Sequence, residues 1–161
     1  MNMALSNSIK SRLAHQHETV LELLEGKSED QLKKRPIPDK WSPFENVAHL
    51  GAYQPAFMQR LDQMLKDGEP RFQRYRAEDD PQFYVYLDLS LLELESDIVS
   101  KRKMMMGMIE QLTDKQLNRA GHHPKFGRLS IGDWLEFFLL HEAHHLFTIF
   151  TLTHVATLDS N

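Results

Sequence analysis

The stretch "FFLLHEAHHLFTIF", residues 137–150, contains the pattern H-E-x-x-H within a run of apolar residues. At about 100° per residue, His141 and His145 share one face of a helix with Trp134 and Phe138. An apolar stripe of this kind marks the face that a helix turns towards the protein interior. Burying an imidazole is costly unless it is hydrogen-bonded or binds a metal, and two at this spacing can reach one ion. The stretch therefore predicts a buried helix that carries a pair of metal ligands.

The H-E-x-x-H pattern on a helix is also the motif of zinc proteases. The extended protease motif requires glycine at position 148 and histidine at position 151, and both are threonine here. A ferritin-like di-iron centre requires two E-x-x-H pairs, and Glu142 to His145 is the only one in the sequence. Both alternatives are therefore weak, and a third ligand has to come from upstream.

Two upstream histidines are candidates for the third ligand. His49 shares a helical face with Ala52 and Tyr53, a small and aromatic lining that suits close packing at the centre of a fold. His17 is the rival, because it also lies on an apolar helical face, although a core histidine bonded to a neighbour is the favoured interpretation there. His144 points to the other side of its helix and is the less favoured ligand.

The composition is typical of a single globular domain spanning residues 1–161, with 41% hydrophobic and 26% charged residues. A formal net charge of −4 argues against a nucleic-acid partner. The chain has no cysteine, which excludes disulfides and thiolate ligands and fits a reducing, cytoplasmic location. The most apolar segment, 131–152, is interrupted by charged residues and histidines, so no membrane span is expected.

Four helices are expected, and strand alternation is nearly absent. The second begins with Ser42 as N-cap, Pro43 at the first helical position and Glu45 closing a capping box, and Pro55 should kink it. The fourth is apolar on nearly all sides and should be the most buried, and the segment with His122 and His123 should be a solvent-facing loop. The expected helices span 7–25, 43–66, 82–112 and 130–153. The fold class is therefore all-α, a four-helix bundle.

Two segments carry a resemblance to a known family. "KWSPFENVAHL", residues 40–50, and "HPKFGRLSIGDWLEFFLLHEAHHLFTI", residues 123–149, have the spacing and helix order of the DinB-like (YfiT-like) family. The chain resembles that family over nearly its whole length. The resemblance implies up-down-down-up connectivity, frequent dimerisation, and one divalent metal ion, zinc or nickel for instance, held by three histidines.

Carried over residue by residue, the family ligands correspond to His49, His141 and His145. The resemblance implies a metal-dependent hydrolase, or a thiol transferase that uses a low-molecular-weight thiol such as bacillithiol, mycothiol or glutathione. Glu142 occupies a position that varies among relatives, so the resemblance assigns it no fixed role.

Three imidazoles leave a coordination position open, which is typical of a catalytic metal site. The expected partners are thus a small-molecule substrate, a low-molecular-weight thiol and a second copy of the chain. Glu142 and Glu45 are the candidates for catalytic proton transfer, and capping is the favoured role for Glu45. The alternative function is a non-catalytic bundle that binds a metal or small ligand in a stress response.

Overall fold

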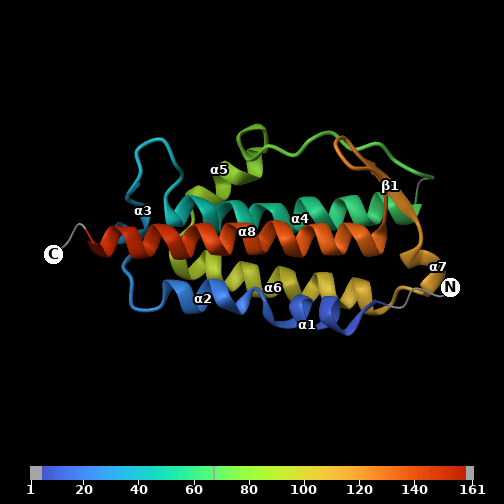
Figure 1. Ribbon diagram of the computed structural model, residues 1–161, viewed down its shortest axis with the longest axis horizontal. Coiled ribbons are helices and arrows are strands. Elements are labelled where there is room, and N and C mark those ends of the chain that lie inside the picture. Colours follow the sequence, from blue (N-terminus) through green and yellow to red (C-terminus); the bar gives the residue numbers. More distant parts are fainter. Residues whose placement is uncertain (1–4, 67, 159–161) are drawn as a thin grey trace.

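The computed structural model describes residues 5–66 and 68–158, and four long helical segments dominate it (Figure 1). The first segment and the fourth run in one direction along the bundle, and the second and third run in the other. This is the predicted up-down-down-up connectivity, and the all-α prediction is confirmed. The four segments are α1 with α2 (Asn7–His15 and Glu18–Leu24), α4 (Pro43–Lys66), α6 (Leu91–Glu110) and α8 (Ile131–Leu158).

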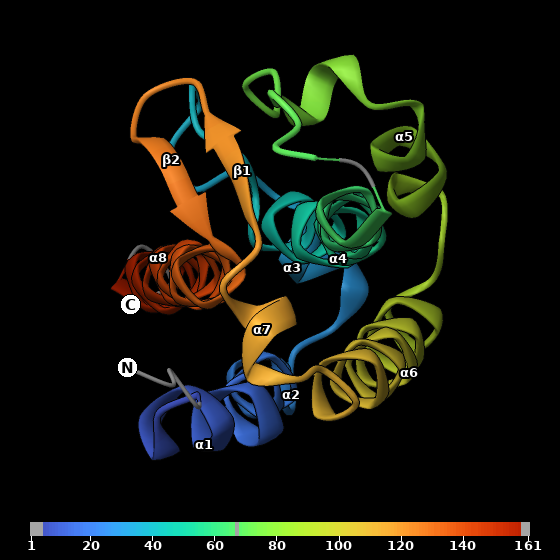
Figure 2. The same cartoon turned by 90° about the vertical axis from the view of Figure 1, so that its right-hand side faces the viewer.

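The end-on view shows how these segments are arranged (Figure 2). α4 contacts both α6 and α8, and the α1–α2 pair also contacts both of them. α4 and the α1–α2 pair therefore lie diagonally opposite each other across the bundle. α8 lies beside α4, which is the arrangement that brings their histidines together.

The first predicted helix is two helices, with a break at Gln16 and His17. The amides of Thr19 and Val20 donate to the carbonyls of Gln16 and His17, three residues back rather than four. The Gln16 side chain donates to the carbonyl of Leu139 in α8 at 2.9 Å. The break is therefore fixed by tertiary contacts, which the helical periodicity of this segment does not reveal.

The third predicted helix, 82–112, was also wrong in one respect, because it is interrupted. Ser90 accepts a hydrogen bond from the amide of Glu93, and the Glu93 carboxylate accepts one from the amide of Ser90. This capping box starts a new helix and so separates α6 from the helix before it. The elements between α4 and α6 are η1 (Ala77–Asp79) and α5 (Pro81–Leu87), and α3 (Glu29–Lys33) precedes α4.

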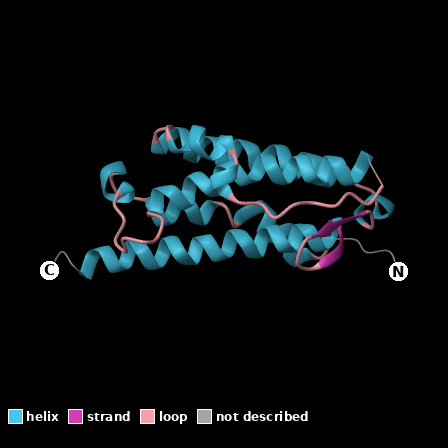
Figure 3. Cartoon of the chain, turned by 90° about the horizontal axis from the view of Figure 1, so that it is seen from above, coloured by secondary structure: helices cyan, strands magenta, loops and turns pink. Residues whose placement is uncertain are grey.

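The segment expected to be a solvent-facing loop is a β-hairpin at one end of the bundle (Figure 3). Strands β1 (Ala120–His123) and β2 (Gly127–Ser130) pair antiparallel, and α7 (Asp114–Leu117) precedes them. Gly127 has φ +73° at the end of the turn, a conformation that favours glycine. His122 and His123 are half-buried rather than solvent-facing, because the hairpin pairs further with the chain at Arg71.

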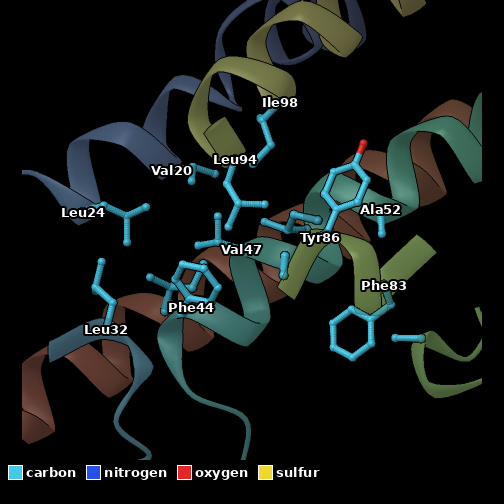
Figure 4. Packing of buried hydrophobic residues seen from close by; sticks show 14 of the residues in the cluster. Val20, Leu24, Leu32, Phe44, Val47, Ala52, Phe83, Tyr86, Leu94 and Ile98 are labelled. Carbon is cyan, nitrogen blue, oxygen red and sulfur yellow. The ribbon is translucent and has the colours of Figure 1, made fainter. Parts of the chain in front are cut away.

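Two clusters of buried apolar residues form the core. One gathers around Val20, Phe44 and Leu94 (Figure 4), and the other around Phe57 and Trp134. Every residue from 46 to 54 of α4 is buried, so α4 is the most enclosed helix of the described chain. The prediction that α8 is the most buried was wrong. Among the described side chains of α8, Leu140 (58% exposed), Phe147 (71%) and Phe150 (45%) are large, apolar and exposed.

Within the described residues, no helix combines the length and the apolar character that crossing a membrane would require.

Candidate metal centre

The N-terminus of α4 sets the position of its histidine. Ser42 and Glu45 form the predicted capping box: the Glu45 amide donates to the Ser42 hydroxyl at 3.1 Å, and the Ser42 amide donates to the Glu45 carboxylate at 2.6 Å. The helix then runs without interruption through Pro55 to Lys66. Glu45 also pairs with Arg35, so its carboxylate is engaged in holding this end of the helix.

α4 and α8 bring three histidines together. The Nε2 atoms of His49 and His141 are 3.1 Å apart. The ring centroid of His145 lies 4.4 Å from that of His49 and 4.7 Å from that of His141. One ring nitrogen from each of the three lies within 4.8 Å of the others. Residues 92 positions apart in the sequence thus form a compact nitrogen cluster at the contact between two long helices.

All three imidazoles are neutral near pH 7. Burial, followed by the proximity of His145, lowers the pKa of His49 to about 3. Burial, followed by the neighbouring imidazoles, also lowers the pKa of His141 and of His145 to about 3. A neutral imidazole keeps a lone pair on one nitrogen, which is the form that binds a metal.

Asn46 fixes the tautomer of one of these rings. The Nδ1–H of His145 donates to Oδ1 of Asn46 at 2.8 Å, which leaves the lone pair on Nε2. Asn46 lies three residues before His49 on the same buried face of α4. The spacing of three residues between Asn46 and His49 is thus the sequence signal for a residue that supports the ligand set.

The buried nitrogens fit a metal ion. The Nε2 atoms of His49 and His141 face each other, whereas the Nδ1 atom of each ring is buried and has no hydrogen-bond partner within the described residues. Tetrahedral zinc with Zn–N bonds of about 2.0–2.1 Å separates its nitrogen ligands by about 3.3–3.4 Å. The Nε2–Nε2 distance of 3.1 Å between His49 and His141 is close to that separation. Three nitrogen ligands of this kind leave a coordination position for a substrate.

Aromatic rings enclose the cluster. Trp41 lies 5.3 Å from His49 and 6.4 Å from His145, and Tyr53 lies 4.5 Å from His141, all between ring centroids. Tyr75 comes from the segment that crosses from α4 to α5, and its ring lies 5.8 Å from that of His49. The sequence offered no periodic pattern in that segment, so Tyr75 could not be assigned to the site beforehand. These rings limit the access of water to the histidines.

Glu142 is adjacent to His141 in sequence, and its carboxylate takes part in a separate buried network. The Arg102 guanidinium forms an ion pair with it, and both side chains are buried. The Gln16 amide donates to its other oxygen at 2.9 Å. Both carboxylate oxygens thus accept hydrogen bonds from residues outside the histidine cluster. A catalytic role for Glu142 stays a prediction.

The remaining histidine candidates lie outside the cluster. His17 is buried, with Nδ1 3.5 Å from the Arg102 guanidinium, which matches the expectation of a core histidine bonded to a neighbour. His144 is exposed, and its ring faces that of His145 edge-on at 5.3 Å.

Comparisons with known proteins agree with this fold. A model of the DinB superfamily matches residues 12–149. The protein YuaE of Bacillus subtilis is 25% identical over 137 residues, covering 76% of this chain and 83% of its own. The structure of YfiT from Bacillus subtilis, described as "a probable metal-dependent hydrolase with an unusual four-helix bundle topology", superposes with a TM-score of 0.73 at 17% identity, covering 94% of this chain and 89% of that one.

A protein structure from Streptococcus pneumoniae superposes with a TM-score of 0.72 at 12% identity, covering 95% of this chain and 92% of that one. At such low identities the structural matches establish the fold.

Proposed function

Because this chain belongs to the DinB superfamily, we propose that it is a metal-dependent hydrolase or thiol S-transferase that acts on a small molecule. The observation that carries the proposal is the cluster of three neutral, inward-facing histidines, His49, His141 and His145. The description of YfiT as a probable metal-dependent hydrolase supports the hydrolytic alternative. The absence of cysteine from the chain means that a transferase would take its thiol from outside.

His49, His141 and His145 would hold one divalent ion, with zinc or nickel suited to imidazole ligands. Such an ion supplies a nucleophile at neutral pH by lowering the pKa of a water or thiol that it binds. Asn46 keeps the Nε2 lone pair of His145 directed away from itself and towards the cluster.

Tyr53 supplies a proton donor beside the cluster. Burial raises the pKa of Tyr53 to about 12, so the phenol stays protonated at neutral pH. Its ring lies against His141, and no hydrogen bond engages its hydroxyl within the described residues. A neutral phenol in this position can donate a hydrogen bond to a substrate oxygen. Glu142 is the second candidate for proton transfer, because it lies next to His141 in the sequence.

The chain is further proposed to act as a homodimer in the cytoplasm. Leu140 and Phe147 lie seven residues apart on the outer face of α8, and both are exposed. Seven residues are almost two full helical turns, so the two side chains lie on one stripe. A second copy of this stripe would cover the apolar surface, and the lack of cysteine fits a reducing compartment.

The metal content of purified, untagged protein tests the metal site. His141→Ala should lose the ion, whereas His144→Ala, a matched change on the exposed side of the same helix, should retain about one ion per chain. Equal metal content in the two variants would disprove the ligand assignment.

Activity is tested separately, on a panel of activated esters, amides and electrophiles with low-molecular-weight thiols. The metal-loaded protein should turn over at least one member of the panel, and His49→Ala should not. Activity that persists unchanged in His49→Ala would remove the metal from the mechanism. A metal-loaded protein with no turnover on the whole panel would instead support the non-catalytic binding bundle.

A further inference from the structure

A cavity of about 540 Å³ opens beside the histidine cluster. His141 and Tyr53 line its inner end, and their ring centroids are 4.5 Å apart. Tyr75, Phe126 and Phe137 form its aromatic walls. The cavity is thus built from α4, the crossing segment, the turn of the hairpin and α8. A volume of this size accommodates a small molecule, and one end of that molecule would lie next to the histidines.

Three cationic side chains, Arg60, Arg74 and Lys125, line the same cavity, and no aspartate or glutamate does. They come from three different segments of the chain. None of the three forms an ion pair within the described residues. Other cations of this protein do form such pairs, for example Arg12 with Glu136 and Arg128 with Glu69.

Contacts with neighbouring groups hold two of these cations, Arg60 and Lys125, at the cavity. The Arg60 guanidinium donates to the carbonyl of Gln73 at 2.9 Å and lies 5.2 Å from the ring centroid of Phe72. The Lys125 ammonium lies 5.4 Å from the ring centroid of Phe126. Positive charges beside apolar walls attract an anion more strongly than they would in bulk water.

The cations of the cavity also lower the pKa of His123, which is another of its lining residues. Burial lowers the pKa of His123, and the positive charges of Arg60 and Lys125 lower it further. The Nδ1 of His123 accepts hydrogen bonds from the amides of Lys125 and Phe126, so its other nitrogen carries the proton. The lining of the cavity therefore carries cations and a neutral imidazole but no carboxylate.

We propose that this cavity binds the carboxylate of a small, partly aromatic substrate whose reactive end lies at the histidine cluster. The inference rests on the proposed function and adds the class of substrate to it. Arg74 and Lys125 would hold the carboxylate, and Tyr75 and Phe137 would contact the apolar body. No helix N-terminus lines the cavity, and phosphate sites are commonly built on one, so the single charge of a carboxylate fits better than a phosphate.

A matched pair of probes tests the charge preference. 3-Phenylpropionate and its neutral isostere 3-phenylpropionamide are titrated calorimetrically into metal-loaded protein and into metal-free protein. The carboxylate should bind at least about tenfold more tightly than the amide in both forms, because a charge-assisted hydrogen bond is worth about that factor. The metal-free arm removes any direct contact of the carboxylate with the ion, so the inference is testable even if the metal assignment fails.

Two double variants that remove the same number of charges test whether the cavity causes the preference for carboxylate over amide. Arg74→Gln/Lys125→Gln should bring the two affinities to within about twofold of each other, whereas Lys34→Gln/Lys103→Gln, which removes two exposed charges elsewhere, should keep the preference. Equal binding of acid and amide by the unmodified protein would overturn the inference. An unchanged preference in Arg74→Gln/Lys125→Gln would also overturn it. Loss of metal from His141→Ala with this preference intact would support both proposals independently.

Discussion

A single buried arginine connects the helices of this bundle. Arg102 in α6 is fully buried and donates to Oε1 of Gln54 at 3.0 Å and to the carbonyl of Leu13 at 3.1 Å. Its remaining nitrogen forms the ion pair with Glu142, and the guanidinium also lies over the ring of Phe138. Buried ion pairs offset their desolvation cost only when the remaining donors and acceptors are satisfied, as they are here.

We expect Arg102→Met to lower the free energy of unfolding by about 3–5 kcal/mol, because it leaves Glu142 as an unpaired buried charge. The double variant Arg102→Met/Glu142→Met should lose less than the sum of the two single variants. Urea denaturation of all four proteins measures this coupling. Strictly additive losses would show that the pair contributes no mutual stabilisation.

The absence of a side chain at Gly51 allows α5 to pack closely against α4. A Cβ at Gly51 would lie 2.6 Å from the ring of Tyr86, closer than any ordinary contact. The Tyr86 hydroxyl donates to Asp97 at 2.6 Å, so the ring is held in place by α6 and cannot easily move away. The contact anchors α5 and, through it, the crossing segment that carries Tyr75 to the site.

Gly51→Ala should destabilise the protein by about 1–3 kcal/mol, the usual range for overpacking, although alanine is the better helix former. Gly107→Ala in α6 is the matched control, because its Cβ would have no neighbour within 4 Å. The control should stabilise the protein by up to about 1 kcal/mol. Thermal unfolding compares the two. A stabilising effect at both positions would refute the steric argument.

At this same scale, local patterns predicted some elements and missed others. The start of α4 at Ser42 followed from its capping signals, and that capping box is present. A box of the same kind, formed by Ser130 and Asp133, begins α8. The break before α6 also had a signal, because Ser90 and Glu93 form the same pattern, but the apolar periodicity on both sides obscured it. The break after α1 had none, since it depends on Gln16 bonding to another helix.

The candidate site likewise has a part that could be predicted from the sequence and a part that could not. His141, His145 and His49 could be grouped because helical spacing places each on an inward face, and the cluster brings them together. The cavity beside them could not be predicted, because Arg60 and Lys125 come from segments joined only by the tertiary fold. Residues on one helix are related by periodicity, and residues on a hairpin and a crossing segment are not.

Across the whole molecule, four histidines with lowered pKa values make the metal-free protein sensitive to acid. Burial, followed by the charge of Arg102, lowers the pKa of His17 to about 4, and the three cluster histidines have pKa values of about 3. The unfolded chain binds these protons near pH 6.5, so between pH 6.5 and about 4 it holds more protons than the folded chain. Stability therefore falls as the pH falls through this window.

Each such histidine should contribute up to about 1.4 kcal/mol per pH unit to that slope. In chelator-treated protein, His17→Gln should flatten the dependence of unfolding free energy on pH between 6.5 and 5. His15→Gln should not, because the His15 side chain is 70% exposed. Urea denaturation at several pH values provides the measurement, and equal slopes for the two variants would contradict the assignment.

The outer face of α8 should determine the assembly of the molecule. Leu140 and Phe147 form an apolar stripe on a helix whose opposite face carries the ligands, so the proposed dimer would place two metal sites back to back. Phe147→Asp should convert the dimer to a monomer in analytical ultracentrifugation, because a buried carboxylate at such an interface would be unpaired. Its metal content should stay unchanged, since Phe147 is not a ligand.

Leu92→Asp is the control: Leu92 is 76% exposed on α6, and its replacement should leave the dimer intact. A monomeric unmodified protein would exclude the dimer, and a dimeric Phe147→Asp would move its interface away from α8.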